Sequence, residues 1–244
     1  MGPRRIERIA MYSRIRHAAV GKILSALNSE FLGRSKCFFG GGTRVVLELK
    51  EYRESADIDF LCSDRDGYRA LRSTITNTSL GKMAARPMTL AREVKADQYG
   101  IRTIVKVGED LIKFEIVREA RIDLGGMPVE GIQVPCLDRR SCFAEKLLAN
   151  DDRWIDESVL NRDVIDLAYM IEAWKPDLFL EGMRLAQQAY GDTVLKSIRS
   201  AAQKLMDEKT YFKKCVEGLR VTKTRTLLSG LRRIMSSDCS STRR

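Results

Sequence analysis

Two short motifs, separated by about the length of one helix, constrain this chain more than any other feature. The first begins with the apolar run Cys37–Phe39 and ends in the turn Gly40–Gly42. Because glycine has no Cβ atom, the backbone N–H groups of such a turn can approach a phosphate closely. The residues from Thr43 onward favour a helix, whose N-terminus also attracts anions. The first motif therefore predicts a phosphate-binding turn between a strand and a helix.

The second motif is a pair of aspartates on a short strand. Asp57 and Asp59 flank Ile58, so the alternation of side chains along a strand places both carboxylates on one face. Two neighbouring carboxylates repel each other, and a hard divalent cation such as Mg²⁺ would offset that repulsion. Taken separately, the glycines could form a plain loop and the aspartates a solvated strand edge. Their occurrence together, at this spacing, favours a functional site.

A third carboxylate lies in a predicted hairpin over residues 101–118, in which two strands of alternating polarity flank a glycine turn. In the second strand, Lys113 and Glu115 share one face. If this strand lies beside the aspartate strand, Glu115 joins Asp57 and Asp59 around the metal. The alternative is an ion pair between Lys113 and Glu115 on a solvated face of the sheet.

Together these residues resemble the core of the DNA polymerase β-type nucleotidyltransferase superfamily. The motifs that carry the resemblance are Gly41-Gly42-Thr43, Asp57-Ile58-Asp59 and Lys113-Phe114-Glu115. Lys146 with Arg153, and the segment 162–167, narrow the resemblance to the AbiEii/AbiGii toxin nucleotidyltransferases, which include the MenA-type toxins. The match extends over about residues 36–170. It implies a toxin of a toxin–antitoxin system, and some members transfer pyrimidine nucleotides onto the 3′ end of tRNA.

Two cationic side chains lie in or just beyond the helix predicted from Asp138 onward. Lys146 and Arg153 are seven residues apart, which is two turns along one face if the helix continues that far. A lysine acts as a point charge and an arginine as a fork, so the pair suits a triphosphate. The alternative is a surface helix in which Glu145 and Asp152 neutralise the two cations.

The next predicted helix begins after Asn161, a suitable N-cap. Asp163 and Asp166 are three residues apart, so both can face one site. A surface ion pair between Arg162 and Asp166 would explain these residues almost equally well. The family resemblance implies that one of the two aspartates belongs to the active site; we favour Asp166, although the sequence leaves the choice open.

The resemblance also implies roles for the other residues. The expected catalytic set is Asp57, Asp59, Glu115, Lys146 and Asp166, of which the first three hold one or two Mg²⁺ ions. The residues expected to bind an NTP, with a pyrimidine NTP as one candidate, are Gly41, Gly42, Thr43, Arg44, Lys146, Arg153 and Asp163. Arg53 precedes the aspartate strand and either contacts the nucleotide or is solvated.

Composition argues against several other kinds of site. The 244 residues include one histidine, His17, which disfavours a zinc site and a Ser–His or Cys–His catalytic pair. Six cysteines without Cys-x-x-Cys spacing predict free buried thiols in a reducing cytoplasm. No apolar run approaches the ~20 residues of a membrane span, and no secretory segment follows the N-terminal arginines. We therefore expect a cytoplasmic protein without membrane contact.

Positive charge gathers towards both ends of the chain. Residues 196–244 hold 13 Lys or Arg and 4 Asp or Glu, and residues 1–22 hold six and one. Since the whole chain carries +10, its middle is mildly acidic. Basic helices are the expected footprint of a nucleic-acid backbone, and tRNA is the partner that the resemblance implies. The alternatives are a solubilising surface or a seat for an acidic antitoxin.

These observations predict an α+β fold. Residues 1–137 are expected to form a mixed β-sheet nucleotidyltransferase domain flanked by helices, residues 138–235 a basic helical domain that contributes to the active-site cleft, and residues 236–244 a disordered tail. Besides the hairpin, the expected elements are helices at 6–30, 43–50 and 66–76, strands at 36–39, 56–61 and 129–137, a polar loop containing Pro87, and helices from 138 onward with breaks near 175, 191, 210 and 221.

The function expected from the resemblance is Mg²⁺-dependent transfer of a nucleoside monophosphate to an acceptor hydroxyl, foremost the 3′ end of tRNA, which would inhibit translation. One alternative is a nucleotidyltransferase of the same fold that modifies an aminoglycoside-like small molecule or a protein side chain. A second is a non-enzymatic RNA-binding protein. The strongly basic C-terminal half disfavours a cationic drug, and the intact set of carboxylates disfavours a non-enzymatic role.

Overall fold

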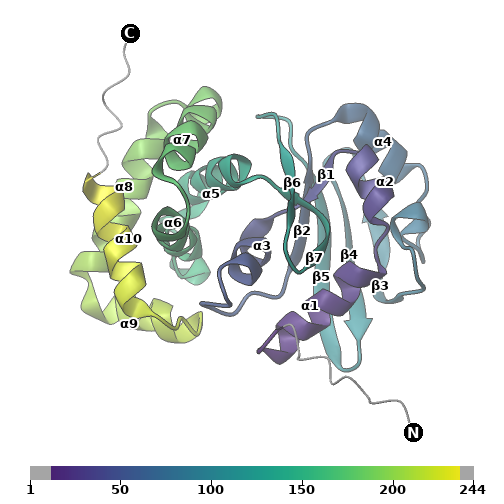
Figure 1. The fold of residues 1–244 in the computed structure, drawn as a ribbon, viewed down its shortest axis with the longest axis horizontal. Helices are drawn as coiled ribbons and strands as arrows, with labels where there is room; N and C mark the ends of the chain where they lie inside the picture. Colours follow the sequence, from purple (N-terminus) through teal and green to yellow (C-terminus); the bar gives the residue numbers. More distant parts are fainter. Residues whose placement is uncertain (1–11, 237–244) are drawn as a thin grey trace, which may run out of the picture.

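The computed structural model of the protein describes residues 12–236, in which one seven-stranded sheet forms the centre of the N-terminal half (Figure 1). The strands are β1 Cys37–Phe39, β2 Ile58–Cys62, β3 Thr89–Ala96, β4 Gly100–Val107, β5 Asp110–Arg118, β6 Gly126–Val129 and β7 Ile132–Leu137. Their order is β3-β4-β5-β2-β1-β7-β6. The pairs β2–β5 and β1–β7 are parallel and the others antiparallel, so the sheet is mixed.

Helices cover both faces of this sheet. Those that precede β7 in the chain are α1 Ile15–Ala26, α2 Ser29–Arg34, α3 Gly41–Glu48 and α4 Arg65–Arg72. Those that follow it are α5 Arg139–Arg153, α6 Arg162–Ala173, α7 Pro176–Tyr190, α8 Thr193–Asp207, α9 Lys209–Gly218 and α10 Thr224–Ser236. In Figure 1, α3 lies between the sheet and the later helices, whereas α1, α2 and α4 lie on the other side. The predicted α+β fold is therefore confirmed, as are the predicted breaks between the C-terminal helices.

The sheet separates two hydrophobic cores. Strand alternation directs Phe60 into the core beneath α1, α2 and α4, and its neighbour Leu61 into the core shared with the helices. The second core also contains Val45 and Val46 of α3, together with buried side chains of α5 to α10. Residue 137 thus marks the change from strands to helices, but one core extends across it. The division into domains at this residue stays a prediction.

The N-terminal helix is shorter than we expected. In place of one helix over residues 6–30, the described residues form α1 and α2, and residues 6–11 lie outside the described part. Two contacts at the break explain the interruption. Leu27 forms an isolated β-bridge with Ala84, and the side chain of Asn28 accepts a hydrogen bond from the N–H of Phe31, which caps α2.

Two strands were not predicted. The expected loop containing Pro87 leads directly into β3, and β6 forms a hairpin with β7 where we expected a single strand over residues 129–137. β3 is an edge strand whose residues are mostly exposed, with Val94 its buried hydrophobic side chain. Its pairing with β4 also contains register shifts. An exposed, irregular strand lacks the regular apolar alternation that sequence analysis depends on.

The remaining expectations concern cysteines, membrane spans and the tail. Five cysteines are free and buried, as predicted, and Cys239 lies outside the described residues. Among residues 12–236, no helix combines the length and apolar character needed to cross a bilayer. The predicted tail also lies outside the described part except for Ser236, which ends α10.

Candidate active site

A pocket of about 240 Å³ lies where the sheet meets α3 and α5. Of the eleven site residues expected from the sequence, seven line it: Gly41, Gly42, Asp57, Asp59, Glu115, Lys146 and Arg153. These residues come from the turn after β1, from β2 and the residue before it, from β5 and from α5. Segments more than 90 positions apart in the chain therefore meet at one place, because β2 and β5 are adjacent and α5 packs across α3.

The glycine turn forms one wall of the pocket. Gly41 has a φ of +65°, in the left-handed region that favours glycine, and a Cβ atom at this position would clash with the carboxylate of Asp59. The N–H of Gly40 donates a 2.8 Å hydrogen bond to the backbone carbonyl of Asp59. The turn is therefore fitted against the aspartate strand, and the first turn of α3 follows directly.

The two aspartates both line the pocket, two residues apart along the chain. Asp59 belongs to β2, Asp57 immediately precedes it, and both side chains are half-buried. Burial raises the pKa of Asp59, and the neighbouring charges of Asp57 and Glu115 raise it further. Within the described residues, neither aspartate has a hydrogen-bond or ion-pair partner for its carboxylate. Their oxygens are thus available to a cation.

Glu115 is the partner of Asp59 in the register between β2 and β5, as the sequence predicted for adjacent strands. Its carboxylate already has two cationic partners, Arg102 Nε at 2.7 Å and Lys113 Nζ at 2.6 Å. Burial acts to raise the pKa of Glu115, but these hydrogen bonds outweigh burial and lower the pKa below its ordinary value. Within residues 12–236 no three acidic, cysteine or histidine side chains already form a metal-binding group. Asp57 and Asp59 could bind a hard cation without losing an existing ion pair, whereas Glu115 would first have to release Arg102 or Lys113.

Two buried aspartates stand behind the opposite wall. The carboxylate of Asp166 accepts hydrogen bonds from Tyr52 Oη at 2.6 Å and Arg53 Nε at 2.7 Å, and Lys146 Nζ lies 2.6 Å away. The carboxylate of Asp163 binds Lys146 Nζ at 2.8 Å and Arg153 Nε at 2.7 Å. Burial raises the pKa of each aspartic acid, but the adjacent cations outweigh it and hold both pKa values below the ordinary value.

This network resolves several alternatives. Asp163 and Asp166 belong to one cluster of ion pairs, so both lie at the same wall. Neither of them lines the pocket. The surface ion pair of Asp166 with Arg162 is not formed, because Asp166 is fully buried against other partners. Lys146 is likewise paired with the two aspartates rather than with Glu145. Arg53, Lys146 and Arg153 contribute three positive charges against two carboxylates, so this wall has one positive charge in excess.

Thr43 and Arg44, two of the predicted nucleotide-binding residues, lie outside the pocket lining. Both are fully buried. The hydroxyl of Thr43 is 2.9 Å from Ser55 Oγ. The guanidinium of Arg44 pairs with Glu48 and lies 5.2 Å from the ring centre of Trp174, at the contact between α3 and the later helices. In this structure these side chains hold α3 in place rather than face the pocket.

The pocket also contains side chains that sequence analysis did not assign. Arg53, which the sequence left undecided, and Ser55 belong to the loop before β2. Glu145 lies on α5, and burial followed by the adjacent charge of Glu119 raises its pKa to about 8. Nothing in an amphipathic helix distinguishes such a glutamate from a surface residue. Lys113, by contrast, could have been found, because it shares a strand face with Glu115.

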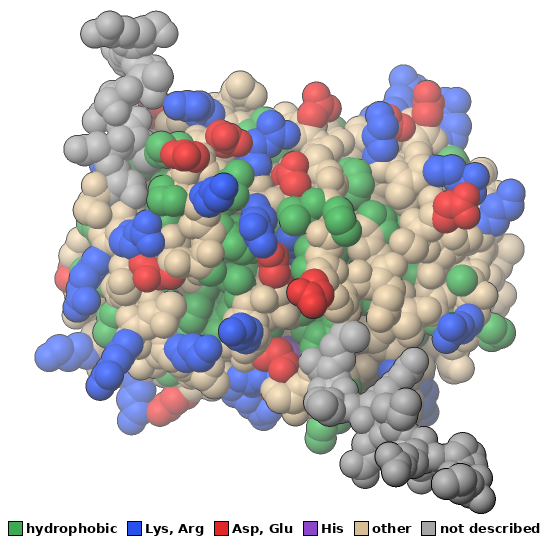
Figure 2. Space-filling model, viewed as in Figure 1, with side chains coloured by type: hydrophobic (Ala, Val, Ile, Leu, Met, Phe, Trp, Pro, Cys, Tyr) green, Lys and Arg blue, Asp and Glu red, His purple; other side chains and the backbone are tan. Residues whose placement is uncertain are grey.

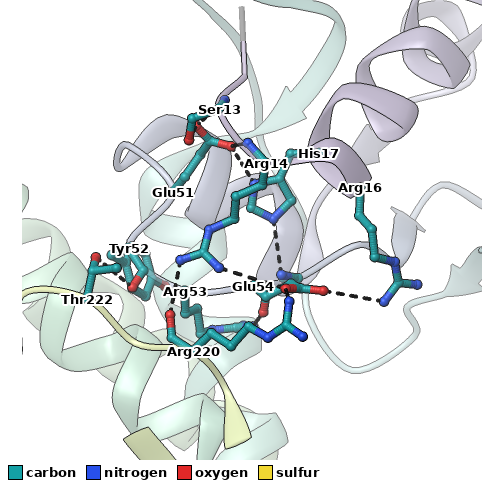
Figure 3. Close-up of polar contacts among 11 residues, drawn as sticks. Ser13, Arg14, Arg16, His17, Glu51, Tyr52, Arg53, Glu54, Arg220 and Thr222 are labelled. Carbon is teal, nitrogen blue, oxygen red and sulfur yellow. Dashed lines mark hydrogen bonds and ion pairs between the residues drawn. The ribbon is translucent and has the colours of Figure 1, made fainter. Parts of the chain in front are cut away.

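The loop that carries Arg53 is held first by the N-terminal helix (Figure 3). The carboxylate of Glu51 accepts hydrogen bonds from Ser13 Oγ at 2.6 Å and from the N–H of Arg14 at 3.1 Å, and it lies 2.7 Å from His17 Nδ1. The other ring nitrogen of His17 accepts a 3.2 Å hydrogen bond from the N–H of Ser55. His17, which is fully buried, therefore links α1 to the residues that lead into the aspartate strand.

The segment between α9 and α10 holds the same loop from the other side (Figure 3). The N–H of Thr222 donates to the carbonyl of Tyr52 at 2.7 Å. Glu54 forms ion pairs with Arg220 at 2.6 Å and with Arg16 at 3.7 Å. The loop is thus fixed between the first and last parts of the described chain, so the position of Arg53 at the pocket depends on both.

Comparison with known proteins gives the family. The family model described as nucleotidyl transferase AbiEii toxin, type IV TA system, matches residues 22–224. The chain belongs to the AbiEii toxin family. Among solved structures, it is similar to an antigenic nucleotidyltransferase-like protein from Paracoccidioides brasiliensis, with 13% identity, a TM-score of 0.40, and coverage of 83% of this chain and 94% of that chain. No protein of curated function matches the chain.

Membership of the AbiEii family bears on the activity, the substrate and the partner of this protein. It supports nucleotidyl transfer as the activity, an NTP as the substrate and a cognate antitoxin as a partner. The resemblance inferred from the sequence is therefore confirmed at the level of the family. The matched region contains the glycine turn, the aspartate pair and the α6 aspartates.

Proposed function

We propose that the protein transfers a nucleoside monophosphate from an NTP, with a pyrimidine NTP as one candidate, to the 3′-hydroxyl of an RNA. tRNA is the foremost acceptor, and its modification would inhibit translation in the cytoplasm. One observation carries the proposal. Asp57 and Asp59, whose carboxylates are unpaired within the described part of the chain, share a pocket with a wall of cations that two buried aspartates fix in place.

The carboxylates of Asp57 and Asp59 would hold Mg²⁺, because they repel each other and have no other partner among the described residues. When bound, the ion would supply charge neutralisation for the triphosphate and the acceptor hydroxyl. The backbone N–H groups of Gly41 and Gly42 belong to the first turn of α3, where a helix N-terminus favours phosphate oxygens. Any side chain at Gly41 would fill the space next to Asp59.

The opposite wall would stabilise negative charge on the departing pyrophosphate. Lys146 and Arg153 line the pocket while their charged groups are bound to Asp163. Arg53 is held in the same way by Asp166. A cation fixed in advance needs no reorganisation when charge develops in the transition state. In this proposal Asp163 and Asp166 are positioning residues, since they act through the cations and do not line the pocket.

Glu115 would serve as a third carboxylate of the site or as the general base for the acceptor hydroxyl. Either role requires it to release Arg102 or Lys113, because both occupy its oxygens now. Lys113 is exposed and lines the pocket beside Glu115, so the triphosphate would compete for the same ammonium. Substrate binding would then free one oxygen of Glu115 for the hydroxyl.

The charge of the surface favours RNA over a cationic small molecule as the acceptor. Figure 2 shows Lys and Arg side chains gathered along the lower left of the molecule, over α9 and α10. A polyanion is attracted to such a surface, whereas an aminoglycoside is repelled. A non-enzymatic RNA-binding role would leave the unpaired aspartates of the pocket without a purpose.

The test is labelling with each of four radiolabelled NTPs in the presence of Mg²⁺ and separate pools of tRNA, total RNA, protein and aminoglycoside. We expect label at the 3′ end of RNA, and none with Asp59→Asn. Label on protein or drug would favour the alternative acceptors. Absence of pyrophosphate release with every pool would support the non-enzymatic reading, and an Asp59→Asn variant that still labels RNA would overturn the metal assignment.

A further inference from the structure

A second cavity, of about 530 Å³, lies at the α4 side of the sheet and is lined by Arg65, Arg69, Arg72 and Arg118. We name these four residues the arginine pocket. Tyr68, Ser73 and Gln98 complete its wall. In Figure 1, α4 lies across the sheet from α3 and the later helices, so this cavity is separate from the candidate active site.

The sequence explains why the four arginines converge. Arg65, Arg69 and Arg72 recur at spacings of four and three, so they lie on one face of α4. Tyr68 and Leu71, which are buried in the core, fix the orientation of the helix. Since α4 follows β2, its start lies near the end of β5, where Arg118 pairs in register with Cys62.

Among residues 12–236, these arginines have no carboxylate partners. No ion pair joins any of the four to an acidic side chain of the described residues, and the one hydrogen bond is from Arg72 Nη1 to the backbone carbonyl of Asp97 at 3.3 Å. The carboxylate of Asp97 binds Arg102 and two backbone N–H groups instead. That of Asp64 binds Lys36 and the N–H of Gly67. Asp66 of α4 pairs with none of the four.

Two arginines of the candidate active site, unlike those of the arginine pocket, are paired with carboxylates. There, Arg53 and Arg153 each have a carboxylate within 2.7 Å. In the arginine pocket, like charges gather without compensation, which is unfavourable unless an anion binds. Guanidinium groups match phosphate oxygens as two-pronged donors. The first and last of the three guanidinium groups of α4 come from residues seven positions apart, about 10 Å along the helix axis, so they suit consecutive phosphate groups rather than a single one.

We infer that the arginine pocket binds the phosphodiester backbone of the RNA whose 3′ end enters the active site. The inference rests on the proposed function for the identity of the acceptor. Glu115 and Arg118 are three residues apart on β5, about 10 Å, and lie on opposite faces of the sheet. An RNA stem is wide enough to contact α4 while its single-stranded end reaches round to the aspartates. The RNA thus contacts the sheet half of the molecule as well as the basic helices.

The experiment measures equilibrium binding of a labelled RNA hairpin with a single-stranded 3′ end, over a range of salt concentrations and without NTP. The variant is R65Q/R69Q/R72Q. These side chains are exposed, and glutamine is as good a helix former as arginine, so circular dichroism should be unchanged. The matched control is K175Q/R184Q/K196Q, which removes three exposed charges from the start of α7, from α7 itself and from α8, away from the basic helices α9 and α10.

We expect the α4 variant to bind the hairpin roughly ten-fold or more weakly at 0.1 M salt and to lower the slope of log K against log salt by about 2 to 3. The control should lose less. In transfer assays the α4 variant should raise KM for RNA and leave kcat unchanged. Equal loss in the control, unchanged binding in the α4 variant, or α4-dependent binding of polyglutamate but not of RNA would overturn the inference.

Binding is measured without turnover, so the two proposals fail separately. A wild-type protein that binds the hairpin through α4 but transfers no nucleotide would refute the proposed function and leave the arginine pocket standing. If the protein labels RNA normally while the α4 variant binds as tightly as wild type, the arginine pocket is refuted and the proposed function stands.

Discussion

The guanidinium of Arg53 donates two parallel hydrogen bonds, of 2.7 and 2.8 Å, to the carboxylate of Asp166, although 113 positions separate them in the chain. Arg53 lies in the loop before β2 and Asp166 in α6. Both side chains are almost fully buried. This one pair therefore ties the sheet to the later helices directly behind the candidate active site.

Asp166→Asn should destabilise the protein strongly. The change leaves the buried charge of Arg53 without a carboxylate, although Lys146 keeps its pair with Asp163. Breaking a buried ion pair at one partner costs about 3–5 kcal/mol. Glu54→Gln, which affects surface pairs with Arg16 and Arg220, is the control and should cost less than about 1 kcal/mol. Urea unfolding measures both. Equal stability of wild type and Asp166→Asn would show that the network does not support the fold.

Asp59→Asn should abolish transfer and leave stability at neutral pH equal or slightly higher. Because burial and the charge of Asp57 raise the pKa of Asp59, the folded protein binds a proton more readily than the unfolded chain does. Its ionisation therefore lowers stability as pH rises through the raised pKa, and the neutral amide relieves this effect. Thermal unfolding and the labelling assay provide the measurements. Asp123→Asn, an exposed aspartate, should change neither, and a clear loss of stability in Asp59→Asn would contradict the sign.

Gly41→Ala should reduce transfer by more than ten-fold, because the new methyl group would displace the carboxylate of Asp59. Gly108→Ala is a matched control. Gly108 also has a positive φ, +62°, but a Cβ atom there meets nothing within 4 Å. Both variants should lose a similar free energy of unfolding, about 1 kcal/mol, from backbone strain, while only Gly41→Ala should lose activity. Equal activity of the two variants would rule out the contact with Asp59.

The stability of the protein should fall as pH drops below about 6.5 because of His17, the one histidine in the chain. Burial lowers the pKa of His17 from its ordinary value of 6.5, despite the hydrogen bond to Glu51. Below pH 6.5 the unfolded chain therefore binds a proton more readily than the folded protein does. The contribution of His17 to the free energy of unfolding is complete above pH 6.5 and declines below it, by up to about 1.4 kcal/mol per pH unit.

Protonation of His17 would also remove the acceptor for the N–H of Ser55. Urea unfolding between pH 5 and 8 should show the decline in wild type and a flatter profile in His17→Gln. The carboxylate of Glu51 titrates elsewhere: burial acts to raise its pKa, but its hydrogen bonds outweigh burial and lower the pKa to about 2. A decline of equal slope in His17→Gln would assign the effect to other groups.

The local chemistry of the site could be predicted from the sequence. The glycine turn, the aspartate pair and the neighbouring strand that carries Glu115 follow from glycine sterics and strand alternation, which act over a few residues. The edge strand β3 escaped prediction because an exposed strand has no apolar period, and the break between α1 and α2 because it depends on a bridge to Ala84.

The sequence by itself determined that a glycine turn, an aspartate pair and Glu115 belong to one candidate site, that the fold is α+β, and the family to which the chain belongs. Only the tertiary structure decided which charges meet. Arg53 with Asp166, Lys146 with Asp163, and His17 with Ser55 are contacts across 17 to 113 positions. The free energy of such a pair depends on burial and distance, and neither is encoded in the spacing of residues along the chain.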